Sequence, residues 1–192
     1  MARLRLLAWD EVVGYVYELA RDISESGYKP DVIVAAGREG LAAARLLSEF
    51  LGVEEVALPG AGLEGKRVLV AVDNSRHLTR EKLEAVEAGR PAEVKTAAIV
   101  GAGVDYSGLR PEEGVEYILP WETVEAAKRL AVEAMREAAR EGKRLWTLEE
   151  LSQAVEQKSG VRLDDISLKR ALDLLEEEGV VEAKDGTWYY TG

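Results

Sequence analysis

Two short apolar runs, in which hydrophobic residues do not alternate with polar ones, constrain the fold of this chain most. They are Val32–Ala36 and Val68–Val72. A strand covered by helices on both faces carries such an uninterrupted run, whereas a strand with one face in water alternates. Further strand-like segments occur at Glu55–Leu58, Val94–Val100 and Val115–Leu119. With helical patterns between them, these strands predict an α/β fold, a doubly wound and mostly parallel sheet.

Helical periodicity fills the intervals between these strands. Apolar residues from Val12 to Ile23 recur every three or four positions, which predicts one helix with Asp10 as its N-cap and Gly27 just after its end. Similar patterns predict helices over Leu41–Phe50, Thr79–Ala88 and Glu122–Arg140.

The loops that follow the strands are the expected ligand site, because open parallel sheets bind ligands at the carboxyl ends of their strands. These loops are Gly37–Gly40, Asp73–Thr79 and Gly101–Gly108. Gly101 and Gly103 form only a fragment of a dinucleotide fingerprint, and a turn that needs a positive φ explains them more simply.

The pattern changes after residue 142. Thr147 and Glu150 form a capping box at the start of a helix, and a second helix around Ile166–Leu175 should end at Gly179. Two strand-like segments then flank the turn at Asp185-Gly186, which predicts a β-hairpin. Two helices followed by a hairpin are typical of a winged helix, so we expect two domains, residues 1–142 and 143–192.

Composition narrows the classes of function. The 192 residues include no cysteine and one histidine, His77, which excludes disulfides, thiolate chemistry and multi-histidine metal sites. No apolar stretch is long enough to span a membrane, and no signal peptide is evident, so we expect a cytoplasmic protein without a membrane partner. The net charge of −11 argues against an unselective nucleic-acid coat. A single asparagine and 32% charged residues suit a thermophile.

Four segments, in this order and spacing, resemble the type I phosphoribosyltransferases, and among them the short purine-type enzymes of archaea. The segments are Leu7–Val12, Tyr28–Gly40, Lys66–Asn74 and Leu119–Glu122, the last carrying the Pro-Trp-Glu sequence. The resemblance covers roughly residues 7–125. It implies a type I phosphoribosyltransferase fold, phosphoribosyl pyrophosphate or a nucleotide as ligand, a purine as base, and Mg²⁺ with bound phosphoribosyl pyrophosphate; no other cofactor or metal site is expected.

The resemblance also assigns roles to individual residues. Asp73 is the candidate catalytic residue and ribose ligand. Residues expected to hold phosphate or pyrophosphate are Arg38, Gly40, Asp73, Asn74, Ser75, Arg76, His77 and Thr79. Tyr106 and Tyr117 are the candidates for the base side of the pocket. Two simpler readings stay open: His77 as a solvent-facing loop residue, and Tyr106 as a packing residue.

The signature segments depart from the family pattern in ways that disfavour efficient catalysis. Asn74 stands where the family has a second acid, the turn after it lacks glycine, and Glu81 replaces a phosphate-facing hydroxyl. Glu39 replaces a glycine of the pyrophosphate turn. Only thirteen residues separate Gly52 from Lys66, where the family has a longer loop and hood. We therefore expect a nucleotide-binding or regulatory protein; the alternatives are an active purine phosphoribosyltransferase and a vestigial pocket.

The C-terminal module is a candidate DNA-binding element, because winged helices place their later helix in the major groove. Its candidate contacts are Arg162, Lys169, Arg170 and Lys184. Residues 143–192 nevertheless hold seven basic and eleven acidic residues. Protein–protein contact is therefore the alternative role, with the Trp188–Tyr190 aromatics as the core of the wing. The alanine-rich segment Ala126–Ala139 suits close helix packing, either as a connection or in an expected homodimer.

Overall fold

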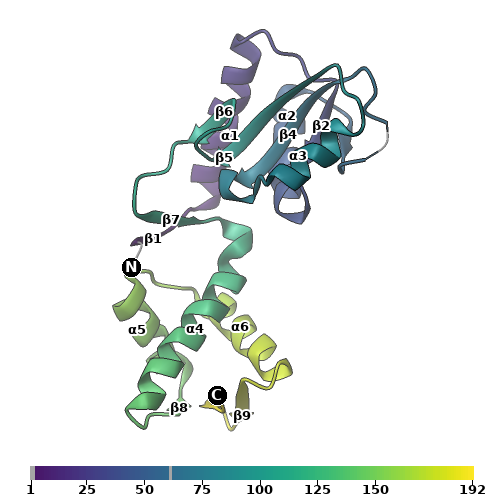
Figure 1. Ribbon diagram of the computed structural model, residues 1–192. Coiled ribbons are helices and arrows are strands. Elements are labelled where there is room, and N and C mark those ends of the chain that lie inside the picture. Colours follow the sequence, from purple (N-terminus) through teal and green to yellow (C-terminus); the bar gives the residue numbers. More distant parts are fainter. Residues whose placement is uncertain (1–2, 61) are drawn as a thin grey trace. The chain divides into compact units, whose positions relative to one another are not determined.

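The computed structural model describes residues 3–60 and 62–192, which form two compact units (Figure 1). The first, the α/β unit, is Ala8–Glu113. The second, the C-terminal unit, combines residues 3–7 with Gly114–Gly192. Among the described residues, no helix is long and apolar enough to cross a membrane.

The α/β unit is built on a five-stranded sheet in which every strand pair is parallel. Its order is β3-β2-β4-β5-β6. The strands are β2 (Val32–Ala35), β3 (Val56–Ala57), β4 (Arg67–Asn74), β5 (Glu93–Val100) and β6 (Tyr106–Leu109). The buried runs of β2 and β4 confirm the parallel sheet expected from the sequence. The sequence predicted a loop over Gly101–Gly108, and this is wrong for its last three residues, which belong to β6. The expected positive φ is present at Gly103, at +72°.

Helices cover both faces of this sheet. Helices α1 (Trp9–Glu25) and α2 (Leu41–Leu51) pack on one face, and α3 (Arg80–Glu87) lies on the other (Figure 1). Val86 of α3 packs with Val34 of β2 and Val70 of β4. Because successive side chains of a strand point to opposite faces of the sheet, the residues next to these valines point away from α3. The expected cap at Asp10 is wrong: Ala8 is the N-cap of α1, and its N–H donates to the Glu11 carboxylate at 2.9 Å.

The described residues of the C-terminal unit form three α-helices, one 3₁₀ turn (Pro120–Glu122) and two small sheets. Strand β1 (Arg3–Leu6) pairs in parallel with β7 (Val115–Ile118). The helices are α4 (Thr123–Arg140), α5 (Leu148–Ser159) and α6 (Asp165–Glu177). Strands β8 (Leu145–Trp146), β9 (Val181–Lys184) and β10 (Thr187–Tyr190) form an antiparallel sheet in the order β8-β10-β9. The predicted turn is present, with Asp185 and Gly186 at φ 51° and 77°.

Helix α4 belongs to the core of the C-terminal unit. Its buried residues Ala127, Ala131 and Met135 pack with Leu168 and Leu172 of α6. The compact units therefore divide at Leu7/Ala8 and Glu113/Gly114, and not at residue 142, because α4 buries its small-residue face against the C-terminal helices. Trp188 and Tyr190 are buried in this core, whereas Tyr189 is 44% exposed.

A surface ion pair at the amino end of the sheet gives the α/β unit a pH-dependent element. The Asp31 carboxylate accepts from Arg67 N and Nη2, both at 2.8 Å. Hydrogen bonds from the Arg67 side chain and backbone lower the pKa of Asp31 to about 2. A folded-state pKa below the unfolded one stabilises the fold above pH ~4, and this contribution is lost as pH falls towards 2.

We therefore expect Asp31→Asn to lower the urea midpoint of unfolding at pH 7 but to leave it nearly unchanged at pH 2. Urea titrations of both proteins at several pH values measure this difference. An equal midpoint difference at both pH values would contradict the role assigned to the Asp31 charge.

Candidate functional site

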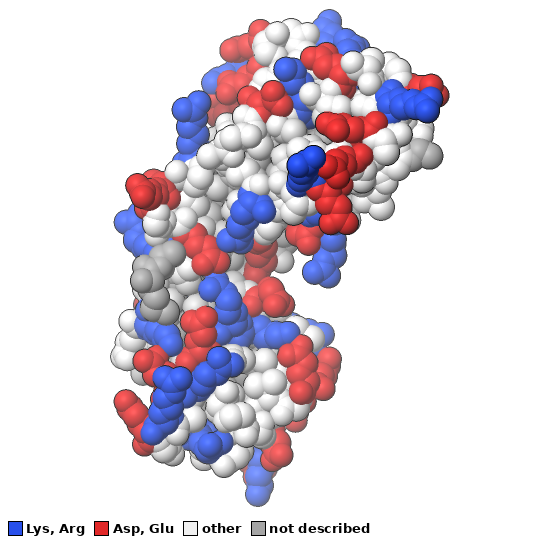
Figure 2. All heavy atoms as spheres, viewed as in Figure 1, with Lys and Arg blue, Asp and Glu red and all other residues white. Residues whose placement is uncertain are grey.

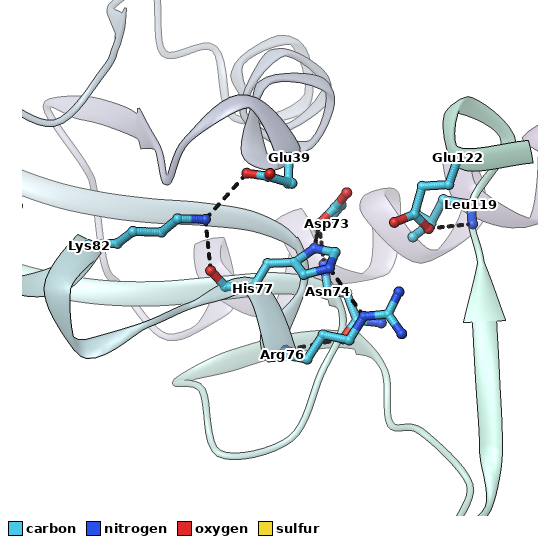
Figure 3. A network of polar contacts seen from close by, with 8 residues as sticks. All are labelled: Glu39, Asp73, Asn74, Arg76, His77, Lys82, Leu119 and Glu122. Atoms are coloured by element: carbon cyan, nitrogen blue, oxygen red, sulfur yellow. Dashed lines mark hydrogen bonds and ion pairs between the residues drawn. The ribbon is translucent and has the colours of Figure 1, made fainter. Parts of the chain in front are cut away.

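The loops that follow β2 and β4 lie at the carboxyl edge of the sheet, and Asp73 anchors the second of them (Figure 3). The Asp73 side chain is buried, with 1% of the residue exposed. Its Oδ1 accepts a hydrogen bond from Asn74 N at 2.7 Å and lies 2.8 Å from His77 Nδ1. A buried carboxylate thus lies at the end of β4, where the sequence predicted a ligand group.

His77 is held in one tautomer by its two neighbours. Arg76 Nε donates to His77 Nε2 at 3.1 Å, so Nε2 carries the lone pair and Nδ1 carries the proton that Asp73 accepts. Only 24% of the His77 side chain is exposed. The histidine is therefore a positioned group at the strand end.

Several side chains expected to bind phosphate also stabilise the loop itself. Asn74 Oδ1 accepts from Arg76 N at 3.1 Å and caps the 3₁₀ turn Ser75–His77. Ser75 Oγ accepts from Ala102 N at 3.1 Å, and Thr79 Oγ1 accepts from Lys82 N at 3.3 Å as the N-cap of α3. These contacts fix the loop without a glycine.

The sequence reasoning missed Lys82, which connects the two loops. Its ammonium donates to His77 O at 2.9 Å and to Glu39 Oε2 at 3.3 Å (Figure 3). The pKa of the Glu39 carboxyl is lowered, chiefly by a hydrogen bond from the Glu39 backbone N–H. Burial opposes this shift, and the hydrogen bond and charge of Lys82 add to it. Lys82 lies three residues after the cap Thr79, in the first turn of α3. This position, just after the loop that follows β4, could have marked Lys82 as a candidate site residue.

The turn after β2 is shaped by backbone packing. A Cβ on Gly40 would lie 2.3 Å from Ala71 O, so glycine is required there for close approach to β4. Arg38 is exposed on the 3₁₀ turn Arg38–Gly40. Gly40 therefore has a packing role independent of any ligand.

The remaining expected residues lie elsewhere. Tyr106 pairs in register with Ala97, three residues before the end of β5; its hydroxyl shares a hydrogen bond with Ser26, and its ring stacks on Tyr28. Tyr117 is buried in β7 of the C-terminal unit, beneath the Arg5 guanidinium. Glu81 is exposed on α3.

Two of the four expected DNA contacts, Arg162 and Arg170, lie beside acidic groups. Arg162 lines a groove of about 560 Å³ with Glu149, Glu156 and Asp165. Arg170 lies 3.7 Å from Glu177. Lys169 is exposed on α6, and Lys184 is exposed at the end of β9. Figure 2 shows the same mixture of blue and red side chains over the face in view.

The sequence matches no protein-family model and no curated protein. Solved structures do match. A purine phosphoribosyltransferase from Pyrococcus horikoshii is 26% identical with a TM-score of 0.54, covering 62% of this chain and 93% of that one. A hypothetical protein from Neisseria gonorrhoeae with bound ppGpp is 20% identical (TM-score 0.55; 64% and 90% covered).

A third match is the Helicobacter pylori xanthine-guanine-hypoxanthine phosphoribosyltransferase, at 14% identity (TM-score 0.54; 64% and 94% covered). The last two similarities concern the fold. Together the three matches confirm the predicted α/β fold of the type I phosphoribosyltransferases.

Proposed function

We propose that the α/β unit binds a nucleotide or a phosphoribosyl pyrophosphate-like molecule at the carboxyl edge of its sheet, in a regulatory or binding role. The observation that carries this proposal is the buried Asp73 carboxylate at the end of β4, followed by the cations Arg76 and Lys82. A ribose offers hydroxyl donors for a carboxylate, and a phosphate requires positive charge and N–H donors.

The residues divide the ligand between them. Asp73 accepts from ribose hydroxyls, Arg76 and Lys82 provide donors for the 5′-phosphate, and His77 positions the Arg76 side chain beside it. Arg38 faces the pyrophosphate side. The donor chemistry also fits Mg²⁺, which is bound through one or two carboxylates together with ligand phosphates. Mg²⁺ would supply charge neutralisation, with Asp73 as its protein carboxylate.

Ligand titrations followed by thermal unfolding test this proposal. A ligand that binds only the folded protein stabilises it and so raises the melting temperature. At a ligand concentration of about a hundred times the dissociation constant, the stabilisation is about 2.7 kcal/mol. We expect purine nucleoside monophosphates with Mg²⁺ to raise it, and free ribose to leave it unchanged. An unchanged melting temperature with every phosphorylated ligand would support the vestigial pocket instead.

The alternative is an active purine phosphoribosyltransferase, favoured by the similarity to the Pyrococcus horikoshii enzyme. Incubation at high temperature with phosphoribosyl pyrophosphate, Mg²⁺ and a purine base distinguishes the two. We expect no nucleoside monophosphate above the no-enzyme control, because Asn74 has replaced the second acid of the loop. Sustained turnover would establish the enzyme.

For the C-terminal unit we propose a winged helix that gives a cytoplasmic, homodimeric regulator its DNA contact. The supporting feature is the helix α6 and hairpin β9–β10, with Lys169, Arg170 and Lys184 as phosphate contacts. We expect the protein to bind a DNA duplex weakly. The logarithm of the binding constant should fall with the logarithm of the salt concentration at a slope of about −3, because three cations neutralise three phosphates. Absence of binding at low salt would favour the protein–protein role.

A further inference from the structure

Glu39 and Lys82 form an ion pair above the turn that follows β2. A Cβ built on Gly37 would lie 3.0 Å from Glu39 Oε2 and 3.2 Å from Lys82 Nζ, so the pair lies directly over the backbone of this turn. The Glu39 side chain is 42% exposed and that of Lys82 is 27% exposed. The pair therefore borders solvent, where an incoming ligand can reach it.

Lys82 has two acceptors in this arrangement, one from each loop. His77 O belongs to the loop after β4, and the Glu39 carboxylate belongs to the turn after β2. An anion that enters beside the turn after β2 meets Lys82, whose positive charge is already compensated by Glu39. It also meets the negative charge of Glu39 itself.

We propose that Glu39 is an internal competitor for Lys82, which makes the site selective for ligands with a single phosphate at the sugar 5′ position over ligands that also carry a pyrophosphate. The inference rests on the proposed function, since it assigns the substrate class of that same site. A nucleoside 5′-monophosphate leaves the contact between Glu39 and Lys82 intact. A pyrophosphate must either displace the carboxylate from Lys82 or lie beside it.

Glu39→Gln tests this directly, because glutamine keeps the size of the side chain and removes its charge. The full chain is titrated calorimetrically, with Mg²⁺, against a purine nucleoside 5′-monophosphate, phosphoribosyl pyrophosphate and inorganic pyrophosphate. We expect the wild type to bind the monophosphate most tightly. In Glu39→Gln the affinities for the two pyrophosphate probes should rise about tenfold, and that for the monophosphate less than about threefold.

Two further variants make the result specific. Glu87→Gln removes one exposed carboxylate from the far end of α3, and it should leave all three affinities unchanged. Lys82→Met should weaken binding of all three probes by about tenfold, and in that background Glu39→Gln should have a smaller effect on pyrophosphate. Circular dichroism shows whether each variant is folded.

The outcomes separate the two proposals. Equal pyrophosphate affinities in wild type and Glu39→Gln overturn the competitor role of Glu39, while monophosphate binding still supports the proposed function. A wild type that already prefers phosphoribosyl pyrophosphate to the monophosphate also overturns it. If no variant binds any probe, the proposed function itself fails, and this inference fails with it.

Discussion

Replacing Gly40 with alanine is expected to destabilise the α/β unit by about 3 kcal/mol or more, at the upper end of the range for overpacked sites. The added Cβ would lie 2.3 Å from Ala71 O and 3.3 Å from Ala35 C, and both are backbone atoms of adjacent central strands. Neither atom can move as the end of a flexible side chain does. The turn after β2 must therefore shift away from β4, which also separates Glu39 from Lys82. Urea-induced unfolding followed by circular dichroism measures the loss.

Gly14→Ala is the matched control, because its Cβ would meet nothing within 4 Å in the middle of α1. Alanine has the higher helix propensity, so this variant should be more stable than wild type by about 0.5–1 kcal/mol. Two glycine-to-alanine changes of opposite sign would establish that packing at Ala71, and not the loss of glycine as such, determines the result at Gly40. A Gly40→Ala protein as stable as wild type would contradict the close packing of this turn.

The core strands and helices of the α/β unit could be predicted because they carry strong periodic signals. The run Val68–Val72 has both faces buried in β4, and the spacing from Val12 to Ile23 matches the buried face of α1. Strand β6 escaped detection because Tyr106–Leu109 is short and only partly buried. Strand β1 escaped because Arg3–Leu6 is only four residues long, so its alternation of Arg and Leu is too short to stand out.

The site was harder to predict, because its contacts join residues far apart in the chain. Asp73 could be identified from its place at the end of a buried strand. The contact of Lys82 with Glu39 spans 43 positions and leaves no periodic trace. Tyr106 shows how register adds what a motif lacks: the sequence left a base-side role and a packing role open, and pairing with Ala97 places Tyr106 against Ser26 and Tyr28.

The extent of the C-terminal unit follows from packing that the local pattern could not reveal. The boundary near residue 142 coincides with a real change of composition, because α4 ends at Arg140. The alanines of α4 indicated close packing but not the partner. Their partner is α6, more than thirty residues later, so the helix is part of the C-terminal core.

Asp73→Ala is expected to have the largest effect on ligand binding, a loss of about a hundredfold in nucleotide affinity. The substitution removes the charged acceptor proposed for the ribose hydroxyls, and it also leaves Asn74 N–H and His77 Nδ1–H without the Asp73 carboxylate, which loosens the loop that holds the ligand. Hydrogen bonds to a charged group contribute about 1.5–3 kcal/mol each, and each 1.4 kcal/mol corresponds to tenfold in affinity. Part of this loss should also appear as a lower melting temperature of the ligand-free protein.

Asp73→Asn separates the two roles of this residue. The asparagine Oδ1 can accept from the same two donors, so the loop and the His77 tautomer should be preserved, and the melting temperature should fall by much less than in Asp73→Ala. The charge that would accept from ribose hydroxyls is lost, so nucleotide affinity should still fall by about tenfold. Calorimetric titration and thermal unfolding of both variants measure the two effects independently. Full nucleotide affinity in Asp73→Asn would mean that Asp73 only supports the loop, and that the ribose is bound by other groups.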